Sequence, residues 1–345
     1  MKKIKALSFG FLSIFFIIGL IACSSDGANK ESGNAGSSTT SLSFAYELPN
    51  DHPWGIGAEE FKKIVEEETN GEITVEIHGA GSLAGSGREI QESVKVGTID
   101  IGISSTPMAQ MNPFVDIFSL PYIFNDRESA WEILDGKIGE QVGEKLEEDN
   151  LKHLAYWEDG FRQVTNSKQQ IKSPEDFDGL RIRVPESELR IETFNALGAS
   201  PLPMSWSEVF TALQQGTIDG QENPLSVVDS SSFYDVQEFL TITNHVYSPA
   251  TLFINIDKWN SLSEEHQEII LKASYAGRDI NRELNKDQDE TLIKELEEKG
   301  MDIHIIEDIS EFREHTKGVW DIVIDELDEE ARDIVDEIIE FQEQG

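Results

Sequence analysis

The chain has 345 residues, 38% of them hydrophobic, and its 66 Asp and Glu outnumber 28 Lys and Arg to give a net charge of −38. This charge excludes nucleic-acid binding through basic patches, and the apolar content, sufficient for two domains with a sizeable core, excludes a disordered acidic chain. One cysteine and seven histidines without metal-ligand spacing exclude a disulfide framework and predict no metal site and no cofactor.

The first 22 residues have the features of a secretory signal. Lysines precede an uncharged stretch over residues 6–22, which is shorter than the ~20 apolar residues of a membrane-spanning helix. Ala22 stands directly before Cys23, which resembles the bacterial lipobox and implies a lipid anchor on Cys23. The alternative is an uncleaved anchor helix with an incidental cysteine. We expect an extracytoplasmic protein on the outer face of the cell membrane, whose mature charge, without three lysines, is −41.

Residues 23–41 are rich in Ser, Gly, Asn and Thr, which is typical of a flexible tether. From residue 42 onward, alternating strand and helix periods predict an α/β fold with parallel strands and right-handed crossovers. The first predicted strands cover residues 42–46, 73–77 and 99–103, and the helices between them cover residues 57–68 and 87–96.

One local pattern occurs twice, 119 residues apart. Gly-Thr-Ile-Asp at residues 97–100 matches the same string at residues 216–219, and the predicted helices before the two strings agree in register. In both copies the glycine is placed to end a helix in the left-handed conformation. The repeat predicts one supersecondary unit present twice, and therefore two similar lobes with a cleft between them.

Two arginines mark the centre of the chain as a candidate anion site. Arg183 belongs to a predicted strand over residues 180–185, in which Arg181 shares its face, and Arg162 stands at the mouth of another predicted strand. An arginine at a strand end can bind a carboxylate through two parallel hydrogen bonds. The alternative is a surface salt bridge, which forms easily in so acidic a chain.

The next segments add an aromatic ring and an amide. Ser205 and Glu208 have the spacing of a capping box, which places Trp206 in the first turn of a helix, where it either stacks on a ligand or packs as a half-buried core aromatic. Residues 220–224 predict a polar turn at a strand exit. Ligands bind at such exits in α/β sheets, and Asn223 offers both a donor and an acceptor there.

The run from Gly160 to Pro224 resembles the solute-binding proteins of TRAP transporters, a family with receptors for four-carbon dicarboxylates, sialic acid and ectoine. The strings that carry the likeness are Leu-Arg-Ile-Arg-Val-Pro at 180–185, Leu-Gly-Ala-Ser-Pro at 197–201, Ser-Glu-Val-Phe-Thr-Ala-Leu-Gln at 207–214 and Asp-Gly-Gln-Glu-Asn-Pro at 219–224. The resemblance implies an α/β, two-lobed periplasmic-binding-protein (Venus flytrap) fold with hinge strands and a long helix spanning both lobes. The implied boundaries are residues 42–160 plus 249–288 for lobe I and 161–248 plus 289–345 for lobe II.

The resemblance also implies which residues bind the ligand. Arg183 would clamp the ligand carboxylate, and Arg162 would be a second arginine that ectoine binders lack. Asn223 and Trp206 would contact the ligand as well.

Three further ligand-binding candidates match the family less closely. Glu47 falls where members place a polar or acidic contact, although residues 48–54 depart from the family pattern. Arg88 and Glu89 lie in a predicted loop that resembles the family's Gly-x-x-x-Arg-Glu turn. The two arginines favour a sugar acid or a dicarboxylate, whereas Glu47 with Trp206 would suit a zwitterion such as ectoine.

The expected function is capture of a small organic acid without catalysis and its delivery to the small and large membrane subunits of a TRAP transporter. A hydrolase is the first alternative, but no Gly-x-Ser-x-Gly string or comparable constellation is present. A sensor that presents its ligand to a receptor is the second, and the sequence leaves it open.

The C-terminal third predicts helices over residues 262–284, 288–299 and 319–341. The last is acidic and amphipathic, which favours a solvated helix face over a partner-docking surface.

Overall fold

The structure, a computed structural model, describes residues 39–327 and 329–344. The predicted signal segment, Cys23 and nearly all of the predicted tether lie outside the described residues. Within the described part of the chain, no helix combines the length and apolar character that crossing a membrane requires. Nor do its His, Cys, Asp and Glu side chains form a group of three or more placed to hold a metal ion.

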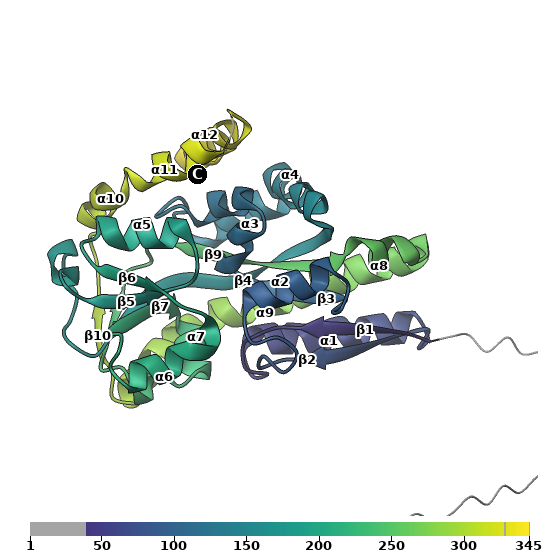
Figure 1. Cartoon of the computed structure of the whole chain (residues 1–345), viewed down its shortest axis with the longest axis horizontal. Coiled ribbons are helices and arrows are strands. Elements are labelled where there is room, and N and C mark those ends of the chain that lie inside the picture. The colour runs from purple at the N-terminus through teal and green to yellow at the C-terminus, as the bar shows by residue number, and fades with distance from the viewer. Residues whose placement is uncertain (1–38, 328, 345) are drawn as a thin grey trace, which may run out of the picture. The chain divides into compact units, whose positions relative to one another are not determined.

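The described body is an α/β fold whose ten strands form one connected sheet flanked by helices (Figure 1). The strands are β1 Thr40–Ala45, β2 Ile73–His78, β3 Ile101–Ser104, β4 Leu151–Asn166, β5 Arg181–Val184, β6 Ser200–Pro203, β7 Gly220–Pro224, β8 Phe239–Ile242, β9 Tyr247–Asn255 and β10 Asp302–Ile305. The α-helices are α1 Pro53–Glu68, α2 Gly87–Lys95, α3 Arg127–Asp135, α4 Lys137–Glu144, α5 Glu188–Ala196, α6 Val209–Gln214, α7 Leu225–Ser230, α8 Ile256–Ser261, α9 Glu264–Glu298, α10 Ser310–Thr316, α11 Val319–Glu326 and α12 Glu329–Gln344. The 3₁₀ helices are η1 Thr106–Gln110, η2 Pro113–Ser119, η3 Lys145–Asp149, η4 Pro174–Phe177, η5 Trp206–Glu208 and η6 Phe233–Asp235.

Two parallel groups of strands are joined by the long antiparallel strands β4 and β9. In the first group, β1 pairs in parallel with β2 and β3, and β3 then pairs with β9. In the second group, β5 pairs in parallel with β6 and β7, and β7 then pairs with β4. The predicted parallel strands are therefore confirmed. Because β4 bonds to β9 along its first part and to β7 and β8 at its end, it serves as a hinge strand between the two groups.

The 119-residue repeat is a structural repeat. Gly97 and Gly216 both adopt the left-handed conformation, with φ of 76° and 66°. The hydroxyl of the following threonine closes the end of each helix, because Thr98 donates to the Ser93 carbonyl at 3.0 Å and Thr217 donates to the Ala212 carbonyl at 3.1 Å.

The aspartate of each repeat ties its strand to the neighbouring parallel strand. Asp100 accepts the backbone N–H of Ser43 in β1 at 2.8 Å, and Asp219 accepts the backbone N–H of Arg181 in β5 at 3.0 Å. The same four residues thus perform the same bonding in both halves, as the repeat predicts.

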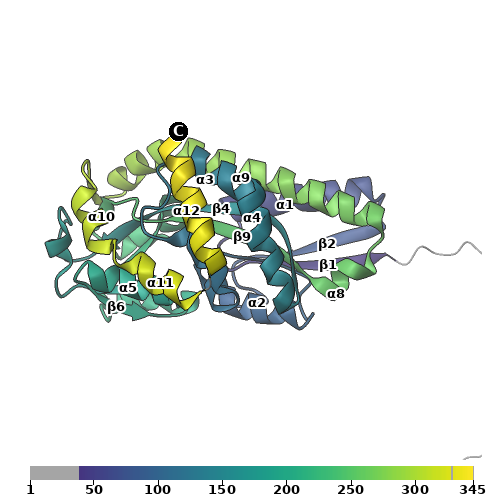
Figure 2. The same cartoon turned by 90° about the horizontal axis from the view of Figure 1, so that it is seen from above.

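The longest helix, α9, has 35 residues and extends along the body in both views (Figures 1 and 2). The prediction of separate helices over 262–284 and 288–299 is wrong. No glycine or proline occurs between residues 278 and 298, and Asn281 and Asn285 donate to the Glu158 carbonyl of β4 at 3.1 and 3.4 Å. These bonds hold the helix on the hinge strand. The helix therefore continues across residues that would otherwise favour a helix end. The predicted long helix across both groups of strands is confirmed, since α9 contacts α1, β4, α7 and β10.

Glycines allow α9 and α1 to approach each other closely over the hinge strand. A Cβ added to Gly277 would lie 2.8 Å from the Gly57 carbonyl oxygen and 2.5 Å from the Trp157 ring. The Trp157 indole N–H donates to the Ser274 carbonyl of α9 at 3.0 Å. Since any larger residue would push the helices apart, these positions require glycine.

The C-terminal helices cross the body from one group of strands to the other (Figure 2). Helix α10 contacts α5 and η4, and α11 contacts α5 and η2. In α12, Glu330 accepts hydrogen bonds from Lys145 and from Gln141 of α4, both at 2.7 Å. The predicted single helix over 319–341 is wrong, because Leu327 takes an extended conformation after α11 and α12 begins at Glu329. The lobe boundaries themselves stay a prediction.

Candidate functional site

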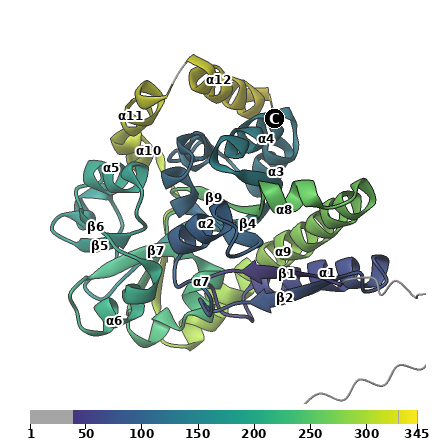
Figure 3. The same cartoon turned by 45° about the vertical axis from the view of Figure 1, so that its right-hand side comes forward.

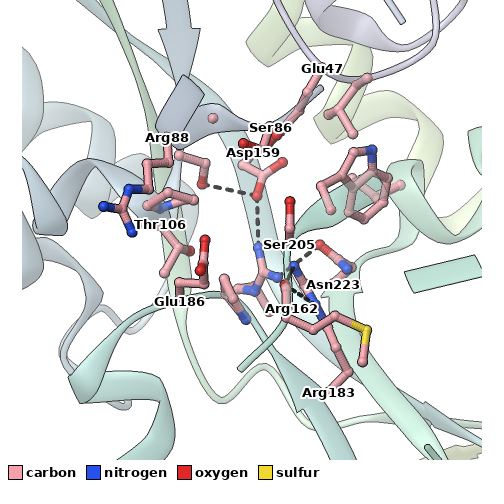
Figure 4. Close-up of a pocket in the computed structure, with 18 of the residues that line it drawn as sticks. Glu47, Ser86, Arg88, Thr106, Asp159, Arg162, Arg183, Glu186, Ser205 and Asn223 are labelled. Atoms are coloured by element: carbon pink, nitrogen blue, oxygen red, sulfur yellow. Dashed lines mark hydrogen bonds and ion pairs between the residues drawn. The ribbon is translucent and has the colours of Figure 1, made fainter. Parts of the chain in front are cut away.

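A pocket lies where strand ends and loops from both groups of strands meet (Figure 4). Its walls come from the segment after β1, the start of α2, the segment after β3, the middle of β4, the exit of β5 and the end of β7. Since the carboxyl ends of parallel strands are the usual ligand sites of α/β sheets, this is the expected place for a binding site. The lining residues are Glu47, Leu48, Trp54, Ser86, Gly87, Arg88, Ser105, Thr106, Pro107, Asp159, Arg162, Arg183, Pro185, Glu186, Met204, Ser205, Trp206, Asn223 and Val227.

Arg183 is a buried cation with no carboxylate partner. Its residue is 3% exposed, and Nε and Nη2 donate to the Met204 carbonyl at 3.0 and 2.6 Å. Among the described residues it forms no ion pair, and its Nη1 makes no hydrogen bond. Burial lowers the pKa of Arg183 to about 10, which leaves it positively charged at neutral pH. Arg181, two residues earlier, instead pairs with Asp219 at 2.8 Å outside the pocket.

Arg162 also lines the pocket, but its charge is already compensated. Nη1 donates to Asp159 at 2.8 Å, and Nη2 donates to Glu222 at 3.0 Å and to Asn223 Oδ1 at 2.8 Å. The prediction that Arg162 stands at the mouth of a strand is wrong, because β4 continues on both sides of it. Its backbone is fixed by strand pairing, so the guanidinium is a rigid part of the wall.

The carboxylate of Glu222 is the centre of the buried charge network behind this wall. It lies 3.1 Å from His245 Nε2 and 3.8 Å from Arg190 Nε, in addition to its bonds with Arg162. Burial opposes its ionisation, but the charge of Arg162, the hydrogen bond from His245 and the charge of Arg190 outweigh burial and hold the pKa of Glu222 well below its usual range. Burial lowers the pKa of His245 against the pull of Glu222, so the ring is neutral at pH 7. The network therefore holds Arg162 in place through the Glu222 carboxylate, which stays ionised.

Glu47 enters the pocket from the side opposite the two arginines (Figure 4). Its residue is half-buried, yet Oε2 is shielded from solvent and has no hydrogen-bond partner. Burial raises its pKa to about 7, against the opposing effects of Arg183 and of the Gly87 backbone N–H. An acceptor without a partner is an unsatisfied group that a ligand donor can satisfy.

Because Glu47 titrates near neutral pH, we expect ligand affinity to depend on pH. Ionised Glu47 repels a carboxylate ligand, and protonation of Glu47 removes this repulsion. Lowering the pH from 8 to 6 should therefore tighten binding, by no more than tenfold per pH unit for one proton. Calorimetric titration across this range measures the effect. In Glu47→Gln the affinity should be independent of pH, and an unchanged pH dependence in that variant would contradict the assignment.

Asn223 and Trp206 both line the pocket as predicted. Asn223 lies in β7, so the predicted turn over 220–224 is wrong; the segment pairs with β4 over its whole length. The Asn223 Nδ2 donates to Gln221, which leaves its second N–H for a ligand. The Trp206 ring packs 5.8 Å from Phe233 and lies 6.0 Å from the Arg183 guanidinium carbon, so it joins the core cluster and the pocket wall at once.

The predicted capping box before Trp206 does not form. Ser205 makes no side-chain bond to the helix, and the residues after it form the short 3₁₀ helix η5 before α6 begins at Val209. Ser205 lines the pocket instead.

Arg88 and Glu89 lie in the first turn of α2, so their prediction as loop residues is wrong and the predicted helix over residues 87–96 is confirmed. Arg88 is at the pocket rim and pairs with Glu92 at 3.1 Å. Glu89 does not line the pocket. Its carboxylate accepts the Gly85 backbone N–H at 2.8 Å, while Ser86 accepts the N–H of Glu89 at 3.3 Å, and together they form the reciprocal cap of the helix.

Sequence reasoning missed several buried members of the site. Glu222 and Asp159 were overlooked, although Glu222 lies inside the Asp-Gly-Gln-Glu-Asn-Pro string and Asp159 is three residues before Arg162. The signal that could have found both acids is that a buried arginine needs a carboxylate partner. Arg190 carried no local signal, since it lies in a helix of ordinary composition and is fully buried only by the tertiary fold.

Comparison with known proteins agrees with the fold. The family "Bacterial extracellular solute-binding protein, family 7" matches residues 44–327. The 2,3-diketo-L-gulonate-binding periplasmic protein YiaO of Escherichia coli is 36% identical over 289 residues, which are 84% of this chain and 85% of the relative.

Two solved structures of TRAP periplasmic solute-binding proteins have the same fold. One, from Haemophilus influenzae with bound L-gulonate, has a TM-score of 0.84 and 31% identity over 88% of this chain and 100% of its own. The other, from Polaromonas with bound D-erythronate, has a TM-score of 0.84 and 34% identity over 87% of this chain and 98% of its own. These likenesses confirm the two-lobed solute-binding fold, and the chain belongs to the bacterial extracellular solute-binding proteins of family 7, the solute-binding proteins of TRAP transporters.

Proposed function

We propose that this solute-binding protein captures a sugar acid, a monocarboxylate with several hydroxyl groups, and delivers it unchanged to the two membrane subunits of a TRAP transporter. The observation that carries the proposal is Arg183, a buried cation in the pocket that has no ion-pair partner among residues 39–327 and 329–344. A ligand carboxylate would supply the missing partner through paired N–H···O bonds.

The charge balance of the pocket favours one ligand carboxylate over two. Its ionisable lining residues comprise three arginines and three acids, and Arg162 is already neutralised by Asp159 and Glu222. A single free guanidinium can compensate one carboxylate. A second ligand carboxylate would be buried beside Glu47 and Glu186 without a partner, which is costly in a desolvated site.

The remaining polar groups suit hydroxyls. The Glu47 oxygen without a partner can accept a hydroxyl hydrogen, and the free N–H of Asn223 can donate to a hydroxyl oxygen. YiaO is named for a sugar acid, and the two structural relatives hold L-gulonate and D-erythronate. These organic-acid ligands support a sugar acid over the zwitterion ectoine.

The proposed capture requires the walls to separate. The space in the pocket that a water molecule's centre can occupy is about 40 Å³, enough for only a few waters. A sugar acid would enter an open form and be enclosed when the two groups of strands close about β4 and β9.

A ligand panel tests the proposed substrate class. We expect L-gulonate and D-erythronate, at about 100 times their dissociation constants, to stabilise the protein by about 2.7 kcal/mol. For a protein of this size that raises Tm by roughly 4 °C in a thermal-shift assay. Stabilisation by succinate or ectoine alone would contradict the sugar-acid assignment. NMR of the ligand after long incubation should show no product, which separates capture from hydrolysis.

Uptake by reconstituted vesicles tests delivery. Accumulation of L-gulonate should require both the protein and the TRAP membrane subunits. Binding without any stimulation of uptake would favour the sensor alternative.

We further propose that Cys23 carries the lipid anchor. The sequence around Cys23 supports this proposal, and the test is made in whole cells. Cys23→Ala should shift the protein from the membrane fraction to the soluble extracytoplasmic fraction, while Ser24→Ala, one residue later, should leave it in the membrane fraction. Fractionation followed by mass measurement of the mature N-terminus checks this, and an unmodified, membrane-bound Cys23→Ala protein would favour the uncleaved anchor helix.

A further inference from the structure

We propose that a second groove, distant in sequence from the sugar-acid pocket, binds a small monocarboxylate with an apolar body. This C-terminal groove is bounded by the segment after η2 and by the C-terminal helices α10 to α12, which lie together in Figure 3. Its volume is about 660 Å³, part of it open to solvent, and it shares no lining residue with the pocket of Arg183. The residues used below are Tyr122, Ile123, Arg313, Lys317, Trp320 and Gln342.

Two cations without ion-pair partners line the C-terminal groove. Arg313 and Lys317 are four residues apart at the end of α10, and neither comes within 4.0 Å of a carboxylate among the described residues. The chain has 66 Asp and Glu, and residues 301–345 are particularly acidic. Two acids, Glu314 and Glu343, also lie on the groove but form no ion pair with these cations. Unpaired cations that share a concave surface are a place where an anion gains from the local field.

Tyr122 adds a rigid donor to the floor of the groove. Its residue is 5% exposed, and its hydroxyl has no hydrogen-bond partner. The backbone adopts a left-handed conformation with φ of 59°, held by a 3.0 Å hydrogen bond from its N–H to the His245 carbonyl. Leaving a buried hydroxyl unpaired costs free energy, and a ligand acceptor would recover it.

Gln342 supplies a second buried donor from α12. Its Oε1 accepts the Asn125 backbone N–H at 3.1 Å and the Ser129 hydroxyl at 3.3 Å, which fixes the amide orientation. The Nε2 group is shielded from solvent and has no partner. Two fixed neutral donors and two cations together match the acceptor oxygens of a carboxylate.

Apolar side chains in the groove would contact the body of the ligand. Ile123 is buried and lines the groove beside the Trp320 ring, whose indole N–H is already bonded to the Pro121 carbonyl at 3.0 Å. Ile339 also lines the groove, so an apolar body would find three apolar side chains there. A carboxylate with an aromatic or aliphatic body therefore fits this part of the groove.

An NMR titration of the ¹⁵N-labelled mature protein with sodium phenylacetate tests the proposal. We expect the Trp320 indole and the Tyr122 and Arg313 amides to shift in one saturable process. Phenylacetamide, the uncharged match, and L-gulonate should each bind this groove at least tenfold more weakly.

Two double variants separate local recognition from net charge. Arg313→Gln/Lys317→Gln should weaken phenylacetate binding at least tenfold. Lys172→Gln/Lys294→Gln removes the same charge from exposed positions outside the groove and should leave binding within twofold. Tyr122→Phe, which keeps the ring, should weaken binding several-fold.

Three results would overturn the proposal. The first is no saturable binding of phenylacetate, and the second is equal loss in both double variants. The third is binding that Arg183→Ala abolishes, because phenylacetate would then occupy the sugar-acid pocket. Loss of transporter-stimulated uptake in Arg313→Gln/Lys317→Gln without phenylacetate binding would identify the groove as a protein interface instead.

Discussion

Arg183→Ala is expected to abolish sugar-acid binding while leaving the fold intact. In the proposed complex the ligand carboxylate is buried against this guanidinium, and removing one partner of a buried ion pair costs about 3–5 kcal/mol. That corresponds to a loss of affinity of a hundredfold or more. Calorimetric titration with L-gulonate measures the loss, and circular dichroism confirms that the variant is folded.

Arg181→Ala is the matched control for this prediction. Arg181 lies in the same strand, two residues away, but its side chain is 43% exposed and it pairs with Asp219 outside the pocket. Its removal should change ligand affinity by less than threefold. Equal losses in the two variants, or unchanged affinity in Arg183→Ala, would show that Arg183 is not the carboxylate clamp.

Glu222→Gln is expected to have the largest effect on stability. The substitution leaves Arg162 and Arg190 buried with too little negative charge, since Glu222 is the carboxylate that both approach. An uncompensated buried charge lowers the free energy of unfolding by about 3–5 kcal/mol. Urea denaturation at pH 7 measures the difference. Glu238→Gln, which changes an exposed glutamate without an ion pair among the described residues, should cost less than ~0.5 kcal/mol.

The stability that Glu222 contributes should also depend on pH in a defined direction. Because its folded-state pKa lies well below the ordinary value of 4.5, the contribution is fully present above pH 4.5 and is lost as the pH falls toward the folded-state pKa. The difference between the native protein and Glu222→Gln should therefore be constant from pH 6 to 7 and shrink below pH 4.5. A difference that grows on acidification would contradict the charge network.

Much of the fold could be predicted because its signals are local. Alternation in residues 42–46 and 73–77 and the glycines at 97 and 216 mark strands and helix ends through interactions within a few residues. Helix α9 shows the limit of such reasoning. Residues 285–287 look like a helix end by local preference, but bonds from Asn281 and Asn285 to the hinge strand carry the helix through. Those partners are more than 120 residues away.

The site shows the same division. Arg183, Arg162, Asn223, Trp206, Glu47 and Arg88 were predicted from motifs, and the structure brings all six to one pocket, while Glu89 caps a helix instead. Which of these side chains already has an ion-pair partner could not be predicted from the sequence. Arg162 is neutralised because the antiparallel pairing of β4 with β7 sets Glu222 next to it, 60 residues later in the chain.

By itself, the sequence determined the α/β class, the internal repeat, the family and the residue types of the binding site, because each follows from local periodicity or contiguous motifs. Only the tertiary structure decided which arginine remains without a partner, that Glu47 titrates near neutral pH, and that Tyr122, Arg313 and Gln342 share a groove. Those properties depend on burial and on the charges nearby, and both arise when segments far apart in the chain come together.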